Sequence, residues 1–122
     1  MPRRILVVDD SASVRQVENV VLTAAGYEVV EAVDGADGLA KLTAQPFHLV
    51  LTDLNMPNVD GVALIRAIRA SPAHRLVPVV MITTESQEAR KQEGRAAGAT
   101  GWIVKPFTPE QLVAVVRRVL GG

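Results

Sequence analysis

Residues 5–11 have the sequence ILVVDDS, in which a short apolar run ends in two aspartates and a serine. Four more apolar runs follow, at residues 29–30, 49–51, 77–82 and 102–104. These runs are continuous and do not alternate with polar residues, which favours strands buried on both faces. Strands of that kind occur in parallel sheets that helices cover on both sides. The runs therefore predict five strands of one parallel sheet.

Helical spacing appears between these runs. Apolar residues share one helix face in three segments: Val14, Val17 and Val21; Leu64, Ile65 and Ile68; and Leu112, Val116 and Val119. Ala25-Gly26 and Ser71-Pro72 indicate helix ends, and Pro109 suits a first helical turn. Five strands alternating with five helices predict a doubly wound α/β fold with right-handed crossovers. We expect the flavodoxin-like (βα)5 arrangement, with strand order 2-1-3-4-5.

The segment from Thr83 to Gly101 contains no large apolar residue. Its alanines bury little apolar area, so packing would stabilise a helix there only weakly. Two interpretations stay open, namely a solvated helix of ordinary stability and a loosely held segment that can shift.

The composition fits one globular domain, with 48% hydrophobic and 21% charged residues in a chain of 122. We expect a single domain over residues 1–122, without a separate output domain. Thirteen basic residues balance thirteen acidic ones, so no basic surplus favours nucleic acid or an anionic membrane as a partner. The absence of cysteine excludes disulfides, thiolate metal sites and a cysteine nucleophile. The first ten residues do not resemble a signal peptide, and no apolar run reaches the ~18–20 residues of a membrane span, so we expect a cytoplasmic protein.

Polar residues follow four of the apolar runs, at the point where each predicted strand ends. They are Asp9-Asp10 after the first run, Thr52-Asp53 after the third, Thr83-Thr84 after the fourth and Lys105-Pro106 after the fifth. In open α/β sheets, ligands bind outside the carboxyl ends of the strands, where the strand order reverses. Three carboxylates, a hydroxyl and an ammonium group are therefore expected to meet at one edge of the sheet.

This set of groups suits phosphoryl transfer. Three neighbouring carboxylates repel one another unless a cation neutralises them. An all-oxygen cluster without His or Cys suits a hard ion, Mg²⁺ in particular. Lys105 can pair with a phosphoryl oxygen, and the Thr83 hydroxyl can donate a hydrogen bond to the same group. One of the carboxylates would then act as the nucleophile.

Each of these residues also has an ordinary structural interpretation when taken alone. Asp10 and Ser11 could cap the first helix, and Asp53 could be a loop acid. Thr83 could be a β-former at the end of a strand, and Lys105 a solvated lysine. The joint arrangement favours a functional site, because each residue lies at the same end of its own strand.

The motifs VVDDS (7–11), LTDLNMPNVDG (51–61), MITTE (81–85) and WIVKPFTP (102–109) resemble the receiver domain of bacterial two-component response regulators. The resemblance covers essentially the whole chain and is greatest to the single-domain, CheY-like chemotaxis regulators. It implies a signalling switch that a sensor histidine kinase phosphorylates. It also implies a regulator instead of an enzyme, which at most catalyses its own phosphorylation and dephosphorylation.

The same resemblance implies roles for individual acidic residues. Asp53 would accept the phosphoryl group. Asp9 and Asp10 would bind Mg²⁺ together with Asp53, and the backbone carbonyl of Asn55 would complete the set of ligands.

Further roles follow from the later motifs. Thr83 would be the switch hydroxyl that moves towards the phosphoryl group, and Lys105 would be the ion-pair partner of that group. Trp102 occupies the aromatic switch position, which is Tyr or Phe in most of the family, and the Lys105-Pro106 peptide would be cis. A downstream protein would bind the face made by the fourth helix, the fifth strand and the fifth helix. We expect a monomer, and dimerisation on phosphorylation stays open.

Three other functions compete with this interpretation. A phosphorelay intermediate would use the same acceptor and pass the phosphoryl group on. An aspartyl-phosphate phosphatase or phosphotransferase acting on small molecules would need an acid/base residue near the nucleophile and a cap over the substrate, and the loops look too short for one. A flavodoxin-like cofactor carrier would need a hydroxyl- and glycine-rich phosphate loop after the first strand, where this chain has two aspartates.

Overall fold

A computed structural model describes residues 2–56 and 59–121 of the chain. Its five strands are β1 (Arg4–Val8), β2 (Glu28–Ala32), β3 (Leu49–Asp53), β4 (Val79–Thr84) and β5 (Gly101–Lys105). Its α-helices are α1 (Ala12–Ala24), α2 (Gly35–Ala44), α3 (Gly61–Ala70), α4 (Glu88–Ala97) and α5 (Pro109–Leu120), and the 3₁₀-helix η1 (Glu85–Gln87) precedes α4. All the strand pairs are parallel, in the order β2-β1-β3-β4-β5. The predicted flavodoxin-like fold and strand order are confirmed.

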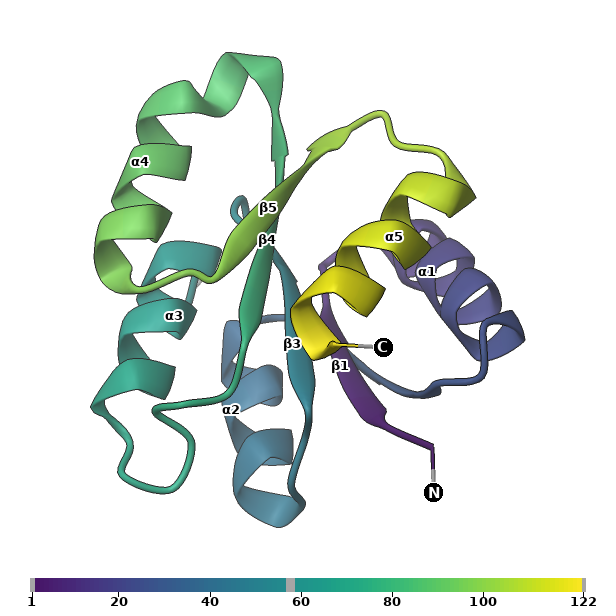
Figure 1. Ribbon diagram of the computed structural model, residues 1–122. Helices are drawn as coiled ribbons and strands as arrows, with labels where there is room; N and C mark the ends of the chain where they lie inside the picture. The colour runs from purple at the N-terminus through teal and green to yellow at the C-terminus, as the bar shows by residue number, and fades with distance from the viewer. Residues whose placement is uncertain (1, 57–58, 122) are drawn as a thin grey trace.

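The sheet separates two hydrophobic cores (Figure 1). Helices α1 and α5 cover one face, and α2, α3 and α4 cover the other. Alternate residues of β1 serve opposite cores, since Ile5 and Val7 lie in the first and Leu6 and Val8 in the second. The continuous apolar run that indicated this strand is therefore explained by burial on both of its faces.

Local capping fixes where the helices begin and end. The side chains of four N-cap residues accept a hydrogen bond from the backbone N–H three residues further on: Ser11, Asp34, Asp60 and Thr108. Helix α1 ends just before Gly26, which has a φ of 98°. Helix α3 ends at Ala70, and Pro109 is the first residue of α5. The three predicted helix boundaries are confirmed, and the cap of α1 is Ser11.

Burial on both faces does not extend to the outer strands. Every residue of β3 is buried, whereas most of β2 is only half-buried. On β5, Trp102 is 40% exposed and Val104 also reaches the surface. The reason is position, because an edge strand is flanked by the sheet on one side only.

Helix α1 turns a different face to the sheet from the one its valines indicated. Val17 is 54% exposed, and the fully buried residues of α1 are Glu18 and Leu22. Val14 and Val21 are half-buried at the borders of this face. The buried stripe of α1 follows the four-residue spacing of Val14, Glu18 and Leu22, and Val17 lies outside it.

Helix α4 packs on the sheet through a glycine. Gly94 is its one buried residue among those described, and a Cβ atom there would lie 2.1 Å from the sulfur of Met81 on β4. Arg90 of α4 also forms an ion pair with Asp60, the N-cap of α3. The expected scarcity of apolar packing is confirmed, and polar contacts contribute to holding this helix.

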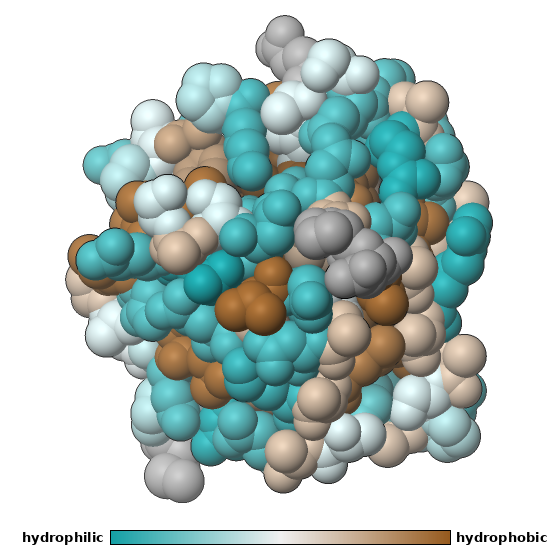
Figure 2. All heavy atoms as spheres, turned by 180° about the vertical axis from the view of Figure 1, so that it is seen from behind, coloured by the Kyte–Doolittle hydropathy of each residue, from teal (hydrophilic) through white to brown (hydrophobic). Residues whose placement is uncertain are grey.

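No helix in the described part of the chain is long and apolar enough to cross a membrane. The face opposite to the view of Figure 1 carries polar side chains over most of its area, with apolar patches between them (Figure 2).

Candidate functional site

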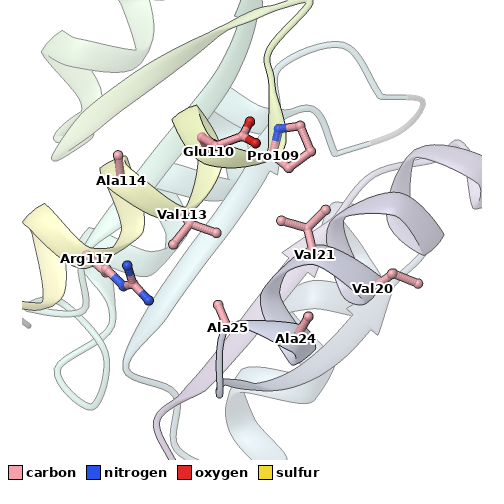
Figure 3. Close-up of a pocket in the computed structure, with 9 residues that line it drawn as sticks. All are labelled: Val20, Val21, Ala24, Ala25, Pro109, Glu110, Val113, Ala114 and Arg117. Atoms are coloured by element: carbon pink, nitrogen blue, oxygen red, sulfur yellow. The ribbon is translucent and has the colours of Figure 1, made fainter.

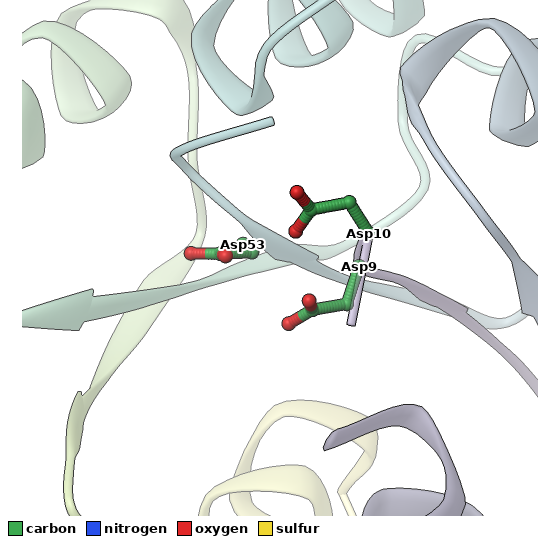
Figure 4. Close-up of side chains that lie close together, drawn as sticks. All are labelled: Asp9, Asp10 and Asp53. Atoms are coloured by element: carbon green, nitrogen blue, oxygen red, sulfur yellow. The ribbon is translucent and has the colours of Figure 1, made fainter. Parts of the chain in front are cut away.

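Three aspartates meet at the carboxyl edge of the sheet (Figure 4). Asp9 and Asp10 directly follow β1, and Asp53 is the last residue of the neighbouring strand β3. Each offers a carboxylate oxygen, and these oxygens all lie within 4.8 Å of one another. Asp9 is 1% exposed and Asp53 9% exposed, while Asp10 faces the solvent. The predicted meeting of the three carboxylates is therefore found.

Burial sets the electrostatics of the two inner aspartates. It raises the pKa of Asp9, which a hydrogen bond from the Ser11 N–H partly offsets, and the nearby Asp53 carboxylate raises it further. Burial likewise raises the pKa of Asp53, against the opposing effects of Lys105 and of the backbone N–H groups of Leu54 and Asn55. The Lys105 ammonium and the neighbouring backbone N–H groups therefore do not fully compensate the negative charge of these carboxylates.

Lys105 brings an ammonium group to the carboxylates of this cluster. It ends β5, and its Nζ lies 3.8 Å from Asp53 Oδ2 and 3.9 Å from Asp9 Oδ2. Both distances fit an ion pair but exceed those of a hydrogen bond. The ammonium group is therefore close to the acceptor candidate and remains free to move.

Thr83 occupies the same edge from β4. It is 1% exposed, and its hydroxyl has no hydrogen-bond partner within the described residues. The next residue, Thr84, is in register with Lys105 on β5. A buried hydroxyl without a partner can donate to a group that arrives at this edge.

The backbone brings the segment after Asp53 into close contact with α3. A Cβ atom at Gly61, the first residue of α3, would lie 2.3 Å from the carbonyl oxygen of Asp53. The Gly61 N–H also donates to the carbonyl of Leu54. Only glycine permits this approach, which fixes the β3–α3 connection beside the site. The side chain of Asn55, predicted as a backbone ligand, points to the solvent.

Trp102 lies on the outer part of the sheet. Two cations of α4 cover its ring, with Lys91 Nζ 4.8 Å and the Arg95 guanidinium carbon 5.1 Å from the ring centroid. The Lys105-Pro106 peptide is cis, as expected from the resemblance.

Sequence reasoning missed one residue close to the site, Glu18. It is fully buried on α1, and burial followed by the charge of Asp9 raises its pKa to about 8. A signal was present in the sequence, since Glu18 lies midway between Val14 and Leu22 at helical spacing.

The residues present suit a hard divalent cation. The three carboxylates supply only oxygen atoms, and Oδ2 of Asp9 is buried without a hydrogen-bond partner in the part of the chain that the structure describes. Oxygen ligands with open positions for water and phosphoryl oxygens are what Mg²⁺ prefers. The site thus fits Mg²⁺ on its own chemistry.

A shallow groove between α1 and α5 lies elsewhere (Figure 3). It is lined by Val20, Val21, Ala24 and Ala25 of α1 and by Pro109, Glu110, Val113, Ala114 and Arg117 of α5. None of the residues at the acidic edge lines it, so the groove is not part of the candidate site.

Acidic residues, a lysine and a threonine at the carboxyl edge of a 2-1-3-4-5 sheet are the groups that a phosphoryl-accepting domain of the flavodoxin-like fold requires. The profile of the response regulator receiver domain matches residues 5–117. The chain therefore belongs to the response regulator receiver family, and it is a phosphorylation-activated regulator of two-component signalling.

Individual relatives support the same assignment. The chain is 41% identical to the chemotaxis protein CheY1 of Helicobacter pylori over 120 residues, which cover 97% of both chains. It is 38% identical to the transcriptional regulatory protein ResD of Bacillus subtilis over 117 residues, which are 96% of this chain and 48% of ResD. The structure of the chemotaxis protein CheY4 of Vibrio cholerae superimposes with a TM-score of 0.93 at 44% identity, covering 98% of this chain and all of CheY4.

Proposed function

We propose that this receiver accepts a phosphoryl group on Asp53 from a phosphohistidine of a sensor histidine kinase. The observation that carries the proposal is the position of the Asp53 carboxylate, 3.8 Å from the Lys105 ammonium and beside the carboxylates of Asp9 and Asp10. Asp9, Asp10, Asp53 and the backbone carbonyl of Asn55 would hold Mg²⁺. When bound, this ion neutralises the charge of the carboxylates and of the incoming phosphoryl oxygens.

The chain's own residues have distinct parts in the transfer. A carboxylate oxygen of Asp53 attacks phosphorus, so that a P–O bond forms as the P–N bond to the kinase histidine breaks. Lys105 pairs with a phosphoryl oxygen, and its present ion-pair distances leave it room to shift. The Thr83 hydroxyl then donates a hydrogen bond to another phosphoryl oxygen.

The transfer is coupled to the surface through Thr83. Movement of its hydroxyl towards Asp53 displaces the end of β4, which leads through η1 into α4. Since α4 buries little apolar area, a small displacement can change its position and the contacts of Lys91 and Arg95 with Trp102. A target protein then recognises the altered α4–β5–α5 face.

The two chemotaxis proteins among the named relatives match this chain over nearly their whole length, which favours a chemotaxis-type regulator that signals by protein binding. We propose a cytoplasmic monomer, with dimerisation on phosphorylation as the alternative, that is no enzyme beyond its own phosphorylation and dephosphorylation. Onward transfer of the phosphoryl group in a phosphorelay is the second candidate, because the same Asp53 could serve it.

The coupling can be tested by NMR with beryllofluoride, which mimics a phosphoryl group on a carboxylate. With Mg²⁺ present, we expect the amide resonances of Thr83 and of residues in α4 and β5 to shift, and Asp53→Asn to abolish the response. Shifts confined to the residues around Asp53 would contradict the proposed route to the surface.

A further inference from the structure

Two hollows flank the side chain of Trp102, which is 40% exposed on β5. The first has a volume of about 380 Å³, and Trp102, Val104 and Val115 give it apolar walls. The second has a volume of about 260 Å³ and lies between Trp102, Val115 and Val119. A drug-sized ligand needs a site of about 300–1,000 Å³ that buries most of its surface. These open hollows therefore suit single side chains of a partner protein better than a small molecule.

Cations gather around the ring of Trp102. Lys91 Nζ lies 4.8 Å and the Arg95 guanidinium carbon 5.1 Å from the ring centroid, and Arg118 of α5 lines the second hollow. Among the described residues, no acidic one lines either hollow. Lys91 pairs with Glu88 at 2.9 Å, whereas neither Arg95 nor Arg118 has an ion-pair partner in that part of the chain. This face is therefore locally positive, although the chain as a whole has no net charge.

The cations over the ring can exchange it for a stronger partner. A contact between a cation and an exposed aromatic ring is weak, whereas a carboxylate forms charge-assisted hydrogen bonds with the same groups. A partner that brings carboxylates therefore draws Lys91 and Arg95 from the ring of Trp102 and leaves the ring to an apolar side chain. Tryptophan and arginine are also the residue types that contribute most to protein interfaces. The aliphatic walls of the hollows and the neutral chain favour a protein segment over a nucleic acid.

Lys105 connects the first hollow to the acidic edge. Its ammonium lies 3.8 Å from Asp53 Oδ2, and the same residue lines the hollow beside Trp102. A shift of Lys105 towards a phosphoryl group on Asp53 therefore alters the wall of this hollow. The affinity of the face for a partner then depends on the state of Asp53.

We propose that the target of the α4–β5–α5 face is an acidic amphipathic segment of a protein. Its carboxylates pair with Lys91, Arg95 and Arg118, and its apolar side chains occupy the two hollows beside Trp102. This inference rests on the proposed function and adds the chemistry of the partner to it.

The test uses three short synthetic peptides with one apolar pattern, whose polar positions are all Glu, all Gln or all Lys. Binding to the protein with Mg²⁺ and beryllofluoride is measured by Trp102 fluorescence and mapped by NMR. We expect the Glu peptide to bind on the order of tenfold more tightly than the Gln peptide, because three partly exposed ion pairs each add a modest amount. The Lys peptide should bind more weakly than both. Without beryllofluoride, the Glu peptide should bind more weakly than with it.

Charge reversal on the protein gives a matched comparison. The double variant Arg95→Glu, Arg118→Glu should lose the preference for the Glu peptide and favour the Lys peptide. Arg66→Glu, on the exposed side of α3, should bind the three peptides as the wild type does. If circular dichroism shows that the double variant does not fold, Arg118→Glu alone should lower the preference by about two- to threefold.

Equal binding of the Glu and Gln peptides, no binding of any peptide, or NMR shifts outside the α4–β5–α5 face would overturn the inference. Single-stranded DNA that binds this face more tightly than the Glu peptide would assign it to a nucleic acid instead. Self-association of the activated protein through Trp102 would assign it to a second copy of the chain. Phosphoryl uptake by Asp53 is measured separately, so failure of the peptides to bind a protein with normal uptake would leave the proposed acceptor unaffected.

Discussion

At the scale of single residues, Glu18 makes the stability of the protein depend on pH. Its pKa is raised from 4.5 to about 8, so between these values the folded protein holds a proton that the unfolded chain has lost. The free energy of unfolding therefore falls as the pH rises through this window. Glu18→Gln removes this pH dependence, so urea denaturation should show a flatter pH profile and, at about pH 8, a gain on the order of a few kcal/mol. A variant profile as steep as that of the wild type would contradict the burial of a titrating Glu18.

The sequence predicted most of the residues at the sheet edge. Asp9, Asp53, Thr83 and Lys105 were predictable because each comes at the same end of an apolar run. Glu18 was not predicted, although it lies midway between Val14 and Leu22 at helical spacing, because a charged residue on a helix is usually solvated. The packing of α1 also explains why Val17, about 100° around the helix from Glu18, is exposed.

Two adjacent residues should respond to substitution with opposite signs. Asp10→Asn removes one of three crowded carboxylates and should stabilise the metal-free protein, while weakening the stabilisation by Mg²⁺. Ser11→Ala removes the cap of α1 and should destabilise the protein by about 1 kcal/mol. Thermal melts with and without Mg²⁺ measure both effects. Saturation to about a hundred times Kd should stabilise the wild type by about 2.7 kcal/mol. Loss of stability in metal-free Asp10→Asn would instead assign Asp10 a structural role.

At the scale of single elements, α4 differs most from the others. Its lack of large apolar residues was evident in the sequence, but its attachment was not. The contact of Gly94 with Met81 and the ion pair of Arg90 with Asp60 depend on how α4 lies against β4 and α3. The Asp60 partner links α4 to the connection that follows Asp53, because Gly61 lies against the Asp53 carbonyl.

Arg90→Ala should loosen α4 without unfolding the protein. We expect faster amide hydrogen exchange within α4 and a change of less than about 1 kcal/mol in the free energy of unfolding, since the ion pair is partly exposed. Arg66→Ala on the exposed side of α3 is the matched control and should leave exchange in α4 unchanged. Equal exchange in Arg90→Ala and the wild type would mean that the ion pair does not restrain α4.

At the scale of the whole molecule, a single sheet carries both the acidic edge formed by Asp9, Asp10 and Asp53 and the exposed side chain of Trp102 on β5. The strand order and both cores could be predicted because continuous apolar runs alternate with helical segments. The stacking of Lys91 and Arg95 on Trp102 could not, because it joins residues of two elements whose relative placement follows only from the complete fold.

Trp102 provides a signal for the state of the entire domain, since it is the one tryptophan of the chain. Beryllofluoride with Mg²⁺ should change its fluorescence, because displacement of α4 alters the cations over the ring. The response should be lost in Asp53→Asn. An equal change of fluorescence in Asp53→Asn would show that the response of Trp102 does not depend on Asp53.

The central claim is that Asp53 is the phosphoryl acceptor, and mass spectrometry of the intact protein after incubation with acetyl phosphate and Mg²⁺ tests it most directly. The account predicts that the wild type gains the mass of one phosphoryl group and that Asp53→Asn gains none. A variant that gains the group to the same extent as the wild type would contradict it.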